Sequence, residues 1–129
     1  MRYLTNEEFR IASRYLFLSM AIIVLEKDLE QIENGAFKIK EPYMNLLRHM
    51  EQLAKNERKN LRGQMRKGNI DVVFIQKNDT FSTYLFMARG YEEERRYFNP
   101  AVRKKVEQLY RELMVEALKD LAQSLSEAY

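Results

Sequence analysis

The sequence predicts an α+β fold that is mostly α, with three long helices and a β-hairpin inserted between the second and third, leaving room for a third strand. Apolar residues recur at three- and four-residue spacing over most of the chain, which is typical of amphipathic helices. β-branched and aromatic residues concentrate between residues 70 and 88, as in strands. The 129 residues include only 4 Gly and 2 Pro, and a chain of this length has the usual size of one domain, so residues 1–129 are expected to form a single domain.

The first helix is predicted over residues 5–33. Thr5 lies three residues before Glu8, the spacing of a reciprocal capping box, and Gly35 follows the last periodic residue. Residues 15–25 are apolar on every face except at Ser19, so we expect them to be buried all round, either as the central core helix or as the seam of a homodimer. This run is shorter than the roughly 20 apolar residues that a membrane span requires, and no membrane association is expected.

The second helix is predicted over residues 42–62. Pro42 suits the first helical position because its missing N–H would have no partner there. Gly63 is expected to end the helix, with Arg62 in its last turn. The apolar positions between these ends form one stripe: Tyr43, Leu46, Leu47, Met50, Leu53, Ala54 and Leu61.

The β-hairpin is predicted over residues 70–88, with turn-forming residues 77–80 between its two strands. A lone hairpin is marginally stable in water, so it must pack on the helices or gain a strand. Residues 91–98 fit either a third strand or a short helix, and the sequence leaves this open. Asn99 and Pro100 form a helix-start signal, and the third helix is expected over residues 100–126.

The residue types argue against most catalytic chemistries. There is no Cys, which removes thiol nucleophiles and fits a reducing cytoplasm. His49 is the only histidine, so zinc motifs with two histidines and acyl-transfer triads have no place here. Carboxylates at helical spacing near Glu30 and Glu116 are interpreted as solvated helix faces. We therefore expect a non-enzymatic protein without metal or cofactor.

The distribution of charge gives the leading functional prediction. The whole chain has a net charge of +3, but residues 35–69 contain nine Lys or Arg and three Glu. At 100° per residue, four of these cations fall within about 60° on the second helix, opposite its apolar stripe. Such a face predicts binding to the phosphates of DNA or RNA, in an accessory or regulatory role like that of small bacterial proteins whose composition this chain resembles. The predicted contacts are Arg48, Lys55, Arg58, Lys59, Arg62, Arg66 and Lys67.

Two further sites are candidates. Cations near the start of the third helix oppose the helix dipole, which predicts a secondary anion site made of Arg95, Arg96, Arg103, Lys104 and Lys105. The alternative function is a protein–protein interaction module, an adaptor or inhibitor, that anchors a protein partner through aromatic residues of the hairpin. Those anchors would be Phe74, Phe81, Tyr84 and Phe86.

Overall fold

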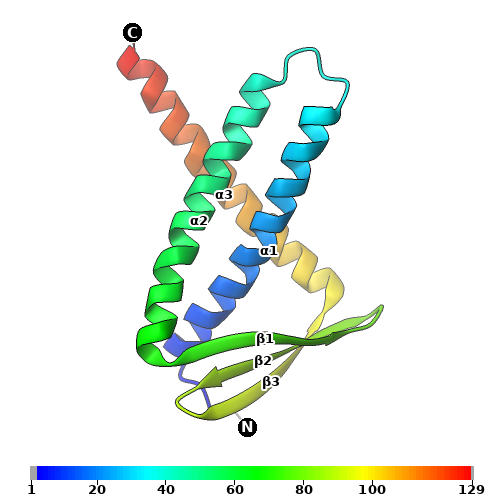
Figure 1. Cartoon of the computed structure of the whole chain (residues 1–129), viewed down its shortest axis with the longest axis vertical. Helices are drawn as coiled ribbons and strands as arrows, with labels where there is room; N and C mark the ends of the chain where they lie inside the picture. Colours follow the sequence, from blue (N-terminus) through cyan, green and yellow to red (C-terminus); the bar gives the residue numbers. More distant parts are fainter. Residues whose placement is uncertain (1–2, 129) are drawn as a thin grey trace.

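The computed structural model describes residues 3–128 and confirms the predicted fold class. Three helices pack on one three-stranded antiparallel sheet, which follows the second helix and precedes the third in the chain (Figure 1). The elements are α1 (Asn6–Asn34), α2 (Glu41–Gly68), β1 (Ile70–Lys77), β2 (Phe81–Ala88), β3 (Tyr91–Phe98) and α3 (Asn99–Ala128).

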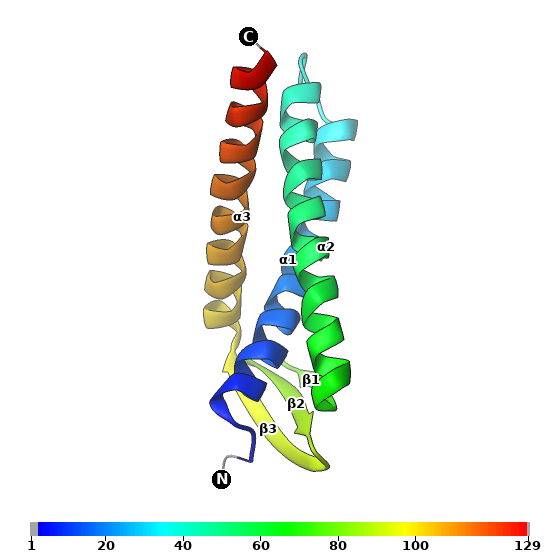
Figure 2. The same ribbon diagram turned by 90° about the vertical axis from the view of Figure 1, so that its left-hand side faces the viewer.

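The helices run lengthwise, and the sheet closes one end of the molecule. α1 and α2 form an antiparallel pair whose connection lies at the end opposite the sheet (Figure 1). α3 starts beside the sheet and crosses the α1–α2 pair obliquely, so that its last turns lie at the end of the molecule opposite the sheet (Figure 1 and Figure 2). The sheet thus packs on the N-terminal half of α1 and on the C-terminal end of α2.

α1 has the predicted start. The Thr5 hydroxyl accepts a hydrogen bond from the Glu8 amide, and the Glu8 carboxylate accepts one from the Thr5 amide. Within the single chain, residues 15–25 are buried only in part: Ile23 and Val24 are 53% and 37% exposed, and Tyr15, Leu16 and Met20 are half-buried. Elements of the same chain therefore cover only part of the surface of this helix.

α2 is longer than predicted, because Gly63 does not end it. The helix continues to Gly68 and ends at Asn69, whose left-handed backbone (φ 52°) is the cap that Gly63 was expected to provide. An exposed glycine inside a helix costs about 1 kcal/mol relative to alanine. Burial of Met65, which is 1% exposed, offsets that cost by about 1.5–3 kcal/mol. Arg66 and Lys67, which the sequence placed in the connector after the helix, therefore lie within α2.

The sheet has the order β1-β2-β3, and its first hairpin has the predicted boundaries. Residues 91–98 form the third strand, which decides the alternative that the sequence left open. A tight turn at Arg89 and Gly90, both with positive φ (52° and 81°), connects β2 to β3. Glu93 of β3 is buried, and the Arg95 Nε donates to it at 2.6 Å, so the charged side chains on the covered face neutralise each other.

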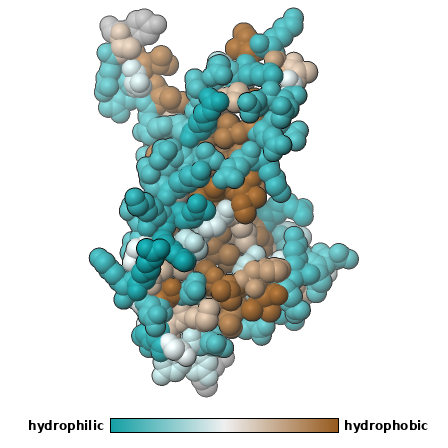
Figure 3. Space-filling view, viewed as in Figure 1, coloured by the Kyte–Doolittle hydropathy of each residue, from teal (hydrophilic) through white to brown (hydrophobic). Residues whose placement is uncertain are grey.

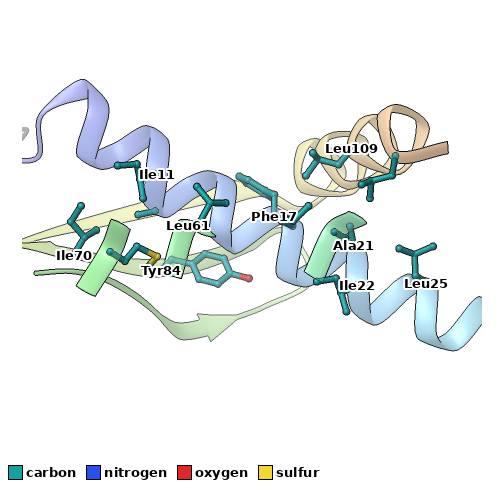
Figure 4. Packing of buried hydrophobic residues seen from close by; sticks show 14 of the residues in the cluster. Ile11, Phe17, Ala21, Ile22, Leu25, Leu61, Ile70, Tyr84 and Leu109 are labelled. Carbon is teal, nitrogen blue, oxygen red and sulfur yellow. The ribbon is translucent and has the colours of Figure 1, made fainter. Parts of the chain in front are cut away.

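One apolar cluster joins all three helices to the sheet (Figure 4). Phe86, at the centre of β2, is completely buried, and its ring lies 5.1 Å from that of Phe9 on α1. Figure 3 shows apolar areas that reach the surface in the middle of one face and over the sheet. Among residues 3–128, no helix combines the length and the apolar character needed to cross a bilayer.

Candidate nucleic-acid interface

The seven cations predicted to contact nucleic acid all lie on α2, and we call them the basic face. Between Lys55 and Arg66 they follow one line along the helix, over about 16 Å at 1.5 Å per residue. Because the helix continues through Gly63, Arg66 falls on the same line as Lys59 and Arg62 instead of in a loop. A rigid helix therefore fixes the spacing of these charges.

Ion pairs divide the basic face into two parts. Arg48 Nη1 lies 3.6 Å from a Glu41 carboxylate oxygen, and Lys55 Nζ lies 3.6 Å and 3.9 Å from carboxylate oxygens of Glu51 and Glu26. Within residues 3–128, the other five cations form no ion pair: Arg58, Lys59, Arg62, Arg66 and Lys67. The positive charge that is free to bind a ligand is therefore at the end of α2 nearer the sheet.

A tyrosine from α1 lies among these cations. A hollow of about 700 Å³ is lined by Tyr15 together with Lys55, Arg58, Lys59, Arg62, Gly63 and Arg66. The Arg62 guanidinium carbon lies 5.6 Å from the centre of the Tyr15 ring, within the range of a cation–π contact. No sequence pattern marks Tyr15 as a site residue because it belongs to the apolar run of α1, and only the packing of α1 on α2 brings it here.

A second hollow continues the first toward the sheet. It has a volume of about 500 Å³ and shares Arg62 and Arg66 with the first. Its remaining lining includes buried Met65 and Ala88, Gly90 from the turn after β2, and one acidic residue, Asp71 of β1. The two hollows form a track with cations along one side and one aromatic ring within it.

Residues 3–118 match the profile of the YhjD protein family. The chain belongs to that family. It is 36% identical over 109 residues to a Bacillus subtilis (strain 168) protein described as uncharacterized protein YhjD, and the match covers 84% of this chain and 91% of that protein. No solved structure is significantly similar. Membership in the YhjD family assigns no activity, so the functional argument depends on the site.

The predicted secondary anion site is not one site, because the structure separates its residues. Arg95 is paired with Glu93 and stacks on Phe9 at 4.1 Å, whereas Arg96 lies 4.3 Å over Phe81. The α3 cations also diverge. Lys105 lies over Phe17 in a hollow between α1 and α3, and Arg103 lines a different hollow beside β1 and β2. Alternation along β3 and rotation along α3 point sequence neighbours in different directions.

The aromatic anchors of the alternative function also separate. Phe86 and Tyr84 are 0% and 8% exposed, so their rings belong to the core and do not present an apolar surface that could anchor a protein partner. Phe81 is half-buried, and Phe74 is 58% exposed. Tyr84 and Phe86 lie on the face of β2 that packs on the helices, and Phe81 points to the other face. Phe74 is paired with Tyr84 and shares its face, but it belongs to the edge strand β1 and remains exposed.

Four acidic side chains pair with basic side chains of another helix: Glu26, Glu57, Glu112 and Asp120. Arg14 of α1 donates to Glu57 of α2 at 2.6 Å and to Glu112 of α3 at 3.3 Å, which joins the three helices. These partners raise the pKa of Arg14, mainly through the hydrogen bond to Glu57. His49 is half-buried, with its Nε2 2.8 Å from Asp120 Oδ2. Residues 3–128 contain no group of three or more side chains arranged to hold a metal ion.

Proposed function

We propose that this protein binds nucleic acid through the basic face of α2, by contact with phosphates, as a non-enzymatic accessory or regulatory protein. The observation that supports this most is the row of five cations without ion pairs at the sheet-proximal end of α2. Exposed helix charges are usually balanced by acids three or four residues away on the same helix, and α2 has no Asp or Glu at that spacing from any of these five. The uncompensated charge has a ligand-sized track beside it.

The geometry suits a phosphate backbone better than a single anion. Lys59, Arg62 and Arg66 are spaced three and four residues apart, which places them about 4.5–6 Å apart along the helix. That spacing is close to the separation of successive phosphates, so each cation can meet a different one. Tyr15 adds an aromatic surface on which an unpaired base can stack, a contact typically worth about 1–3 kcal/mol in single-strand binding.

The test is a titration of fluorescein-labelled duplex and single-stranded oligonucleotides, followed by anisotropy between 50 and 200 mM salt. With four phosphate contacts, affinity is expected to fall about 100-fold over that range. The triple variant Lys59→Gln, Arg62→Gln, Arg66→Gln should lose most binding and reduce the slope of log affinity against log salt by about three.

A matched control removes the same charge elsewhere. The triple variant Lys104→Gln, Arg111→Gln, Lys119→Gln changes three exposed cations on α3 and should bind with the affinity of the unaltered protein. Equal loss in both triple variants would mean that net charge alone drives the association. If no oligonucleotide binds at 50 mM salt, the proposal is wrong.

A second candidate function is protein interaction through the exposed apolar side chains of β1. Val73, Phe74 and Ile75 are 37%, 58% and 46% exposed on this edge strand. Consecutive exposed apolar residues are unusual on a free strand and can anchor a partner. Phe74→Ser should then abolish capture of a defined partner, while capture that survives this change argues against the surface.

A further inference from the structure

A separate hollow lies at the other end of β1 from the basic face. Its volume is about 280 Å³, and it is lined by Met20, Lys77, Ser82, Tyr84, Asn99, Val102 and Arg103. An eight-residue strand spans about 23 Å from its first to its last residue, so this hollow is well separated from the track beside Arg66. It combines the end of β1, the covered face of β2 and the start of α3.

Both cations in this hollow are uncompensated. Lys77 and Arg103 form no ion pair within residues 3–128, and no acidic residue lines the hollow. The first turn of α3 contains no acidic residue either. Pro100 has no N–H, and the Asn99 N–H donates to the Thr80 carbonyl. Ala101 and Val102 therefore provide the first-turn N–H groups without an intrahelical partner, where the helix dipole favours an anion. The charge around the hollow is therefore of one sign.

Tyr84 provides the second, independent observation. The residue is 8% exposed, yet its hydroxyl makes no hydrogen bond within residues 3–128. The Tyr97 hydroxyl also lacks a hydrogen-bond partner, but it is fully buried and does not line the hollow. Tyr84 does line the hollow. Figure 4 shows the Tyr84 ring beneath α1 with its hydroxyl pointing away from Ile70. Burial raises the pKa of Tyr84, which keeps this hydroxyl protonated as a donor.

The start of α3 is held rigidly beside these donors. The Ser82 hydroxyl donates to the Asn99 side-chain oxygen at 2.6 Å, and the Asn99 amide donates to the Thr80 carbonyl at 2.8 Å. The Asn99 side-chain nitrogen also donates to the Asn78 carbonyl at 2.8 Å. Because these bonds tie the helix start to the β1–β2 turn, the hollow is organised before any ligand arrives.

We propose that this hollow binds the terminal phosphate of a small phosphomonoester, held by Lys77, Arg103, the Tyr84 hydroxyl and the amides of Ala101 and Val102. A monoester fits better than a diester because donors approach from the strand, the sheet face and the helix, and only a terminal phosphate has three free oxygens to meet them. Met20 and Val102 supply an apolar wall for the carbon group of the ester. The site does not depend on nucleic-acid binding by α2.

The experiment is an NMR titration of the full chain with methyl phosphate, dimethyl phosphate and inorganic phosphate at constant ionic strength. Methyl phosphate should give saturable shifts at the amides of Ser82, Tyr84 and Val102, and dimethyl phosphate should bind at least tenfold more weakly. An oligonucleotide with a 5′-phosphate, compared with its 5′-hydroxyl form, distinguishes a nucleic-acid end from a free small molecule as the source of the phosphate. Preference for the phosphorylated oligonucleotide over methyl phosphate would identify the nucleic-acid end.

Three variants make the test specific. Tyr84→Phe removes only the hydroxyl, which has no partner to lose, so stability should be unchanged while methyl phosphate binds about tenfold more weakly. Arg103→Gln should abolish saturable binding. Lys104→Gln removes a neighbouring charge that does not line the hollow and should bind like the unaltered protein. Absence of saturable shifts at millimolar methyl phosphate, or equal affinity in Tyr84→Phe and Lys104→Gln, overturns the proposal.

Discussion

Gly63→Ala should stabilise the protein, and the sign of its effect tests the observed course of α2. Gly63 lies inside the helix, and a Cβ built there meets no atom within 4 Å. Alanine is favoured over glycine by about 1 kcal/mol at an exposed helix-interior position. Had Gly63 been the left-handed cap that the sequence predicts, alanine would instead have cost a similar amount.

The expected gain of about 1 kcal/mol corresponds to a rise in Tm of roughly 3–5 °C for a domain of this size. Urea unfolding followed by far-ultraviolet circular dichroism measures the free energy directly, with an unchanged m-value as the check that only stability has moved. A Gly63→Ala variant less stable than the unaltered protein would refute a continuous helix from Glu41 to Gly68.

Gly90→Ala is the matched control. This glycine also has no atom within 4 Å of a built Cβ, but its φ of +81° is a conformation that alanine adopts only with strain. It should therefore lose about 1 kcal/mol or more under the same conditions. Neither glycine has an atom close to the added Cβ, so opposite changes in unfolding free energy at Gly63 and Gly90 would come from backbone conformation and not from steric crowding.

Three further predictions concern the core, the acid stability and the oligomeric state. Phe86→Ala should lower the unfolding free energy by about 3–5 kcal/mol in urea melts, because the side chain is fully buried, whereas a loss below 1 kcal/mol would contradict its central place. A hydrogen bond from Arg89 lowers the pKa of Glu8 to about 2, so its stabilising contribution is present above the unfolded-state pKa of about 4.5 and is lost as pH falls toward 2. Melting curves from pH 6 to pH 2 should therefore show a smaller loss of Tm for Glu8→Gln than for the unaltered protein, and identical curves would count against this linkage. If α1 residues 15–25 form the homodimer seam, light scattering should show Ile23→Asp halving the mass, and a mass near 15.5 kDa for the unaltered protein excludes the seam.

The boundaries of the first hairpin follow from local chemistry. The side chain of Asn78 accepts hydrogen bonds from the Thr80 and Phe81 amides, both at 2.8 Å, so turn and strand ends are specified within a few residues. β3 is different because its Glu- and Arg-rich centre has weak strand propensity. Pairing with β2 decides its conformation, and the Glu93 carboxylate additionally accepts from the Tyr3 amide at 2.8 Å. Burial alone would raise the pKa of Glu93, but bonds from Arg95 and from the Tyr3 and Leu4 amides outweigh burial and lower it.

The candidate site was also predictable only in part. The alignment of cations on α2 follows from helical periodicity, which depends on sequence spacing alone. Which cations are already paired depends on other elements, since Glu26 of α1 lies 3.9 Å from Lys55. The hollow lined by Lys77, Tyr84 and Arg103 was harder to foresee, because these residues come from three elements that only the tertiary structure brings together.

By itself, the sequence determined the three helices, the hairpin, the capping box at Thr5 and the concentration of positive charge on the second helix. These features depend on interactions within a few residues, which spacing and residue type express directly. The tertiary structure alone decided that α2 continues through Gly63, that residues 91–98 form a strand, that Tyr84 and Phe86 are core residues, and which cations remain free of ion pairs. Each of those outcomes depends on burial or pairing between segments distant in the chain, and local propensity yields to them because they contribute more free energy.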